Sequence, residues 1–76
     1  MSYGYTTRID NLNHKADQSL LGVRLGRVCI DNDVSVTEMA SQLGVSRQTI
    51  YNWFVGFHEP NNELTAYVEA LISEYK

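Results

Sequence analysis

A short run of polar side chains has the residue types that can recognise the edges of DNA bases. Arg can donate two hydrogen bonds to guanine, and Gln and Asn can pair with adenine in a similar two-point manner. A Thr methyl or an aromatic edge can pack on the methyl group of thymine. One such two-point contact discriminates between bases by about 1–3 kcal/mol. The candidate base-reading residues are Ser46, Arg47, Gln48, Thr49, Tyr51 and Asn52.

The apolar residues around this run predict a helix that turns it outward. Ile50, Trp53 and Phe54 recur three and four residues apart, which is the period of one helical face. Ser46 can cap the helix by accepting a hydrogen bond from a backbone N–H in the first turn. We therefore expect a helix over about residues 46–54, with one face in the core and the polar face exposed.

A second short helix is predicted directly before the first. Ser35 and Glu38 match a capping box, in which the hydroxyl and the carboxylate each accept a backbone N–H of the first turn. Gly44 follows where a left-handed residue would end this helix and redirect the chain. The apolar face between these points consists of Val36, Met39, Ala40 and Leu43. Ala40 is small, as a residue must be where the second helix crosses closely.

These two helices and their turn resemble a known DNA-binding motif. The segment 36–55 reads VTEMASQLGVSRQTIYNWFV and is similar to the helix-turn-helix of the lambda repressor and Cro family, also called XRE-type. The resemblance implies a lambda-repressor-like domain from a bacterium or bacteriophage. It further implies a transcriptional regulator that binds double-stranded DNA sequence-specifically. Residues 46–54 would form the recognition helix in the major groove.

The resemblance also implies contacts to DNA phosphates. In that family they come from the start of the first helix of the motif and from the loop after the recognition helix. The matching positions are Ser35, Thr37, Gln42 and His58. That loop usually carries Lys or Arg, whereas this chain has Phe57, His58 and Glu59. The candidates for the missing positive charge are Arg24, Arg27, Lys15 and Arg8.

The remaining chain predicts two further helices and an N-terminal arm. Apolar residues at helical spacing run from Ala16 to about Ile30, and again from Asn61 to the C-terminus. Gly22 and Gly26 in the first of these segments would let another backbone approach closely. Residues 1–14 show no helical period. We therefore expect an all-α, compact four-helix domain over residues 15–76, preceded by a flexible arm.

The charge balance argues against a generic DNA-binding protein. Six Lys and Arg residues face nine Asp and Glu residues, so the net charge is −3, whereas most DNA-binding domains are basic. Between Ala40 and Phe57, however, Arg47 is the only charged residue. A neutral reading surface predicts weak non-specific binding unless two copies combine their contacts. Since one helix-turn-helix reads about half a turn of groove, we expect a homodimer.

Other classes of site find little support in the sequence. A single cysteine, Cys29, excludes a disulfide within the chain and a Cys-based zinc cluster. His14 and His58 lack the spacing of metal ligands, and Ser46 lacks a base that would activate it. We therefore expect no enzyme activity, cofactor or metal. No run approaches about 18 apolar residues and no signal region is evident, so we expect no membrane contact and a cytoplasmic location in a bacterial host.

Two alternative functions stay open. The acidic exterior could bind a protein partner, as in a phage factor that inhibits a host machine. A helix-turn-helix protein that no longer binds DNA should then carry an acid or a large apolar residue among its base-reading positions, and none is present. A DNA-binding subunit of a recombination or replication complex would use the same docking. Trp53 and Phe54 could also stack on single-stranded bases, but Trp53 falls on the inner stripe and is predicted to be core.

Overall fold

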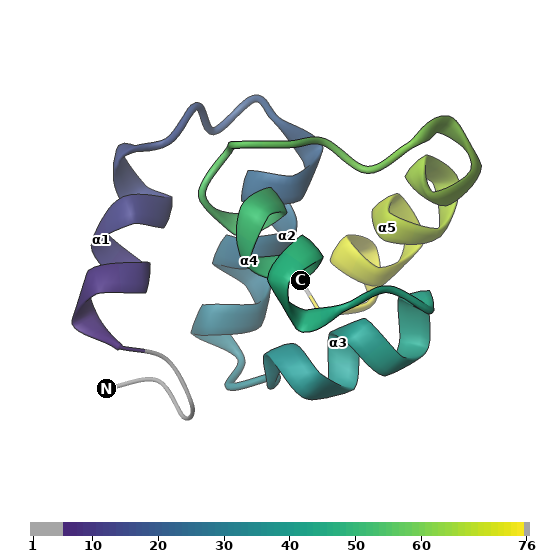
Figure 1. Ribbon diagram of the computed structural model, residues 1–76, viewed down its shortest axis with the longest axis horizontal. Helices are drawn as coiled ribbons and strands as arrows, with labels where there is room; N and C mark the ends of the chain where they lie inside the picture. The colour runs from purple at the N-terminus through teal and green to yellow at the C-terminus, as the bar shows by residue number, and fades with distance from the viewer. Residues whose placement is uncertain (1–5, 76) are drawn as a thin grey trace.

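The computed structural model describes residues 6–75, which form five helices around one core (Figure 1). In chain order they are α1 (Thr7–Lys15), α2 (Leu21–Asp31), α3 (Val36–Leu43), α4 (Arg47–Phe54) and α5 (Asn62–Tyr75). No strand occurs within the described residues. The all-α prediction is confirmed, and the predicted count of four helices is one too low.

The additional helix is α1, which replaces most of the predicted flexible arm. Thr6 caps it, because its hydroxyl oxygen accepts a hydrogen bond from the Ile9 N–H at 3.2 Å. The helix has few apolar residues, and the side chain that it buries completely is the polar Asn13. A search for an apolar face therefore misses it. Residues 1–5 of the predicted arm lie outside the described residues.

The second helix begins five residues later than predicted, at Leu21 rather than near Ala16. Ala16 has extended backbone angles at the end of α1. In the turn that follows, the Asp17 carboxylate accepts hydrogen bonds from the backbone N–H and the hydroxyl of Ser19, at 2.9 and 2.6 Å. This local turn uses residues that could otherwise have extended the helix.

Helix α2 lies at the centre of the domain and contacts α1, α4 and α5. Two glycines allow α4 to approach it. A Cβ atom at Gly22 would lie 2.7 Å from the Trp53 Cβ, and one at Gly26 would lie 2.8 Å from the Phe54 Cγ. The close approach predicted from these glycines is confirmed. It sets the distance between the central helix α2 and α4, which carries the polar run.

The core combines the apolar faces of α2, α3, α4 and α5. Trp53 is 4% exposed, so its prediction as a core residue is confirmed. Tyr67 of α5, in contrast, is exposed, although it is one of the residues at apolar helical spacing after Asn61. The fully or almost fully buried side chains include Leu25, Cys29, Ile30, Met39, Ile50, Phe54, Val68 and Ile72. None of the helices within residues 6–75 has both the length and the apolar character needed to cross a membrane.

Candidate nucleic-acid interface

Local hydrogen bonds begin α3 and α4, and one of the two hydrogen bonds predicted for the capping box is present: Ser35 caps α3, but the Glu38 carboxylate does not accept the Ser35 N–H. The Ser35 hydroxyl oxygen accepts the Glu38 N–H at 3.1 Å at the start of α3. Gly44 ends α3 with a left-handed backbone, φ 70°. The Ser46 hydroxyl oxygen accepts the Thr49 N–H at 3.2 Å and begins α4. Only three residues therefore separate the two helices.

Helix α4 has one buried and one accessible face. Ile50 and Phe54 are completely buried. Arg47 and Gln48 are exposed on the other side, and Tyr51 is half-buried. The buried side chains fix the rotation of α4 about its axis. Polar groups are thereby presented to the outside along two turns of the helix.

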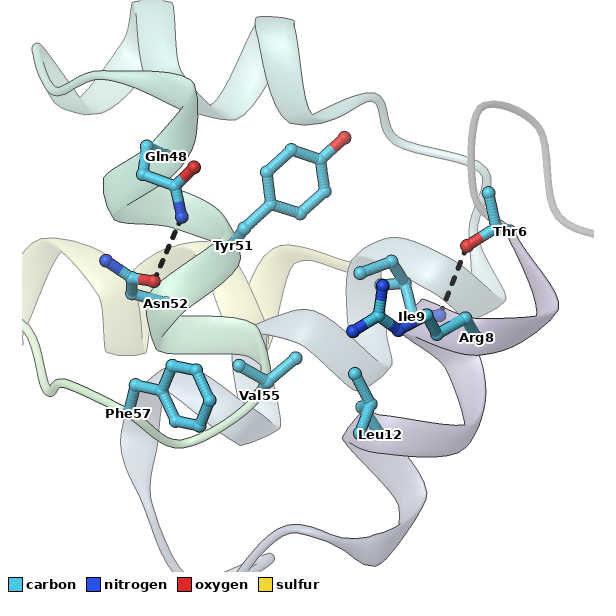
Figure 2. A pocket seen from close by; sticks show the side chains of 9 residues that line it. All are labelled: Thr6, Arg8, Ile9, Leu12, Gln48, Tyr51, Asn52, Val55 and Phe57. Carbon is cyan, nitrogen blue, oxygen red and sulfur yellow. Dashed lines mark hydrogen bonds between the residues drawn. The ribbon is translucent and has the colours of Figure 1, made fainter.

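Two of the predicted base-reading side chains are already joined. The Gln48 Nε2 donates a hydrogen bond to the Asn52 Oδ1 at 3.1 Å, one helical turn away (Figure 2). The pair still has a carbonyl oxygen on Gln48 and an NH2 group on Asn52 for further hydrogen bonds. At the start of the helix, the hydroxyls of Ser46 and Thr49 lie 2.9 Å apart and are hydrogen-bonded. Such contacts restrict the rotamers of the polar face before any ligand binds.

The predicted phosphate-contact residues fall into two groups. Ser35 and Thr37 lie at the start of α3, Gln42 is exposed further along α3, and His58 is exposed after α4. All four lie on the two helices of the motif or on the loop that follows.

The other two phosphate candidates lie elsewhere. Arg24 and Arg27 of α2 border a hollow that includes Ile72 of α5 and none of the α4 residues. Arg27 is also held by two carboxylates, with its guanidinium nitrogens 2.9 Å from an Asp10 oxygen and 2.8 Å from an Asp31 oxygen. The structure does not bring these arginines to the polar face of α4. Helical spacing alone could not reveal this, because the rotation of α2 follows from its contacts with three other helices.

A different arginine lies beside α4. Arg8 of α1 lines a hollow of about 330 Å³ together with Gln48, Tyr51 and Asn52 (Figure 2). Arg8 was predicted to lie in a flexible arm, whereas it lies in the first turn of the capped helix α1. The sequence signal for that helix was Thr6, a suitable N-cap residue, followed by the apolar Ile9.

Glu59 in the loop after α4 has a structural role, which explains why an acidic residue occurs at this position. Its two carboxylate oxygens accept the backbone N–H groups of Leu21 and Gly22, at 3.1 and 2.9 Å. The residue at the start of α2, Leu20, provides no side-chain cap. Glu59 therefore caps α2 from the far end of the chain. Its negative charge is paired with the N-terminal end of that helix, which favours anions.

The described residues contain neither a cluster of metal ligands nor a reactive thiol. No three His, Cys, Asp or Glu side chains there are grouped as metal ligands. The Cys29 thiol is completely buried, and burial raises its pKa to about 12, with the Glu38 charge acting in the same direction. Such a thiol stays protonated at neutral pH and is a poor nucleophile.

No protein-family model matches the chain, and neither the search of curated proteins nor the search of solved structures found a match.

Proposed function

We propose that this protein is a sequence-specific double-stranded DNA-binding protein that acts as a transcriptional regulator. In this proposal α4 enters the major groove of a half-site. Arg47, Gln48 and Asn52 then hydrogen-bond to base edges, and Tyr51 packs against a thymine methyl or the sugar. The supporting observation is the two-sided character of α4, with a completely buried apolar face and a polar face that contains no acid.

The placement of the acidic residues supports the same proposal. Glu59, in the loop after α4, is engaged at the start of α2. Burial is the main cause of the raised pKa of Cys29 and of Tyr75, and the Glu38 charge adds to it in both, so Glu38 lies within electrostatic range of α2 and α5. Since no acid occurs between Ala40 and Phe57, the net charge of −3 does not describe the segment that contains α4. DNA responds to the potential of the approaching surface as well as to the total charge.

Regulation would follow from occupancy of the operator. A dimer that places two copies of α4 in successive major grooves would block polymerase or position it, in the cytoplasm of a bacterial host or of a phage-infected cell. The two half-sites would lie about 34–36 Å apart on one side of the duplex. This arrangement predicts a palindromic operator.

Selection from a pool of random duplexes tests the proposal. The protein is bound to the pool at low and at physiological salt, and the retained sequences are amplified and read. We expect one enriched motif for the parent protein. Arg47→Ala and Gln48→Ala should lose this motif at the positions that they read, each with a penalty of about 1–3 kcal/mol.

Arg24→Ala is the matched control, because it removes the same charge from another exposed helix position. It should retain the motif and the affinity. If the parent enriches no sequence at either salt, the DNA-binding proposal is wrong. The acidic adaptor that binds a protein partner would then be the function to test.

A further inference from the structure

The hollow beside α4 lies between α1 and α4. The two helices are joined by a hydrogen bond near their C-terminal ends and lie further apart elsewhere. The Asn13 Nδ2 of α1 donates a hydrogen bond to the Phe54 carbonyl oxygen at the end of α4, at 2.7 Å. Towards the start of α1 the two helices border the hollow (Figure 2). The residues that line it are Thr6, Arg8, Ile9, Leu12, Gln48, Tyr51, Asn52, Val55 and Phe57.

The charge of this lining is opposite to that of the whole chain. None of its nine residues is acidic, and Arg8 is its only charged group. Arg8 is exposed and forms no ion pair within residues 6–75, whereas Arg27 pairs with two carboxylates. A guanidinium without a carboxylate partner can pair with a phosphate without first breaking a salt bridge.

We propose that Arg8 binds a phosphate of the DNA strand that passes α4 on the side of α1, and that the hollow receives the backbone of that strand. This inference rests on the proposed function of α4. In Figure 1, α1 lies to the left of α4, and α3 lies below it. A helix in the major groove has a phosphate backbone on each side. In this proposal α1 would meet one of these two strands, because its Arg8 lies beside Gln48, Tyr51 and Asn52 of α4.

The remaining lining suits a sugar-phosphate chain. The Thr6 hydroxyl oxygen accepts the Ile9 N–H, which leaves its O–H free to donate to a phosphate oxygen. Leu12 and Phe57 are 38% and 75% exposed and offer apolar surface to a deoxyribose ring. The hollow thus combines one cation, polar groups and apolar walls. A second copy of the chain is the other possible occupant, and it would use the apolar walls without needing Arg8.

The test compares Arg8→Gln with Arg24→Gln on the duplex that the parent protein selects. Dissociation constants are measured from about 50 to about 200 mM salt. We expect Arg8→Gln to bind more weakly at low salt and to reduce the slope of log affinity against log salt by about 0.9, the value for one phosphate contact. The selected motif should not change, and Arg24→Gln should behave like the parent.

Ethylation interference locates the contact, because Arg8→Gln should relieve interference at one phosphate on one strand. If the parent binds and Arg8→Gln has the same slope and the same interference pattern, this inference is wrong and the proposed function stands. If the parent selects no duplex, both fail. Loss of self-association by Leu12→Gln in sedimentation without DNA, with phosphate contacts unchanged, would assign the hollow to a second copy and overturn the inference.

Discussion

Asn13 is the only polar side chain that is fully buried within the described residues. Its Nδ2 donates to the Val23 carbonyl oxygen of α2 at 3.0 Å and to the Phe54 carbonyl oxygen of α4 at 2.7 Å. Its Oδ1 has no donor within the described residues. One amide group therefore joins three helices, and the position requires a donor in particular.

Asn13→Asp tests this requirement with almost no change of shape. The carboxylate cannot donate and would face two carbonyl oxygens, so we expect a loss of at least about 3 kcal/mol in the free energy of unfolding at neutral pH. The pKa of the new carboxyl group would be raised in the native state. The loss of unfolding free energy should therefore shrink as the pH falls towards the pKa that the group has in the unfolded state. Urea unfolding at several pH values measures both effects.

Asn11→Asp provides the control, since Asn11 is exposed on the same helix. It introduces the same charge at the surface and should change the free energy of unfolding by less than about 0.5 kcal/mol. Equal losses for the two variants would show that the charge on α1, rather than the lost donor, causes the effect.

The buried thiol of Cys29 predicts a loss of stability in alkali. Its pKa rises from an ordinary 9.0 to about 12 in the folded protein. Below pH 9.0 the thiol is protonated in both states. Above it the unfolded chain ionises first, so the free energy of unfolding should fall by up to about 1.4 kcal/mol per pH unit until the folded thiol also ionises.

Cys29→Ala should have a shallower decline than the parent between pH 9.0 and about 12. Tyr75, whose pKa is also raised by partial burial, titrates in both proteins. The difference between the two urea-unfolding series therefore reports the ionisation of the thiol together with its coulombic effect on the pKa of Tyr75. Parallel curves would show that Cys29 ionises equally in the folded and unfolded states.

At the scale of elements, α2 depends on a cap from the opposite end of the chain. Glu59→Ala removes the acceptors of two backbone N–H groups at its start, and we expect a loss of about 1–2 kcal/mol in thermal or urea unfolding. Glu69→Ala removes the same charge from an exposed position on α5 and should be nearly neutral. An equal loss in the two variants would contradict the capping role.

Substitution by Ala and by Asn should have opposite orders of stability at Gly22, in the helix contact, and at Gly44, in the turn. At Gly22 an added Cβ would lie 2.9 Å from the Trp53 carbonyl oxygen, so Ala should cost about 1–3 kcal/mol and the larger Asn more. At Gly44 an added Cβ would have 4 Å of open space beyond the neighbouring residues of the chain, but φ is 70°. Asn adopts this conformation more readily than Ala. In urea unfolding, the Asn variant should therefore be less stable than the Ala variant at Gly22. At Gly44 the Asn variant should be the more stable of the two.

At the scale of the whole molecule, size and charge together predict two copies on one operator. The longest extent of the domain is 31 Å, whereas half-sites one helical turn apart are separated by about 34–36 Å. The net charge of −3 disfavours loose binding of single copies. We expect two protomers on the full motif by native mass spectrometry, with much weaker binding to an isolated half-site. Equal affinity for the full and the half motif would contradict the dimer.

The sequence by itself determined the features that involve neighbouring residues. The caps at Ser35 and Ser46, the left-handed Gly44 and the two faces of α4 all depend on residues within four positions of one another. Helical periodicity and hydrogen bonds of the first turn act over this range, so they can be recognised from residue types. The all-α class and the outward direction of the polar run followed from them.

The tertiary structure decided which surfaces meet. Asn13 joins partners 10 and 41 positions away, and Glu59 caps a helix that begins 38 positions earlier. These contacts depend on the rotation and spacing of packed helices, which no local pattern fixes. The same packing directs Arg27 towards Asp10 and leaves Arg8 beside α4. The groups that surround the candidate DNA-binding face were therefore selected by helix packing, because charges distant in sequence become neighbours only when the core is assembled.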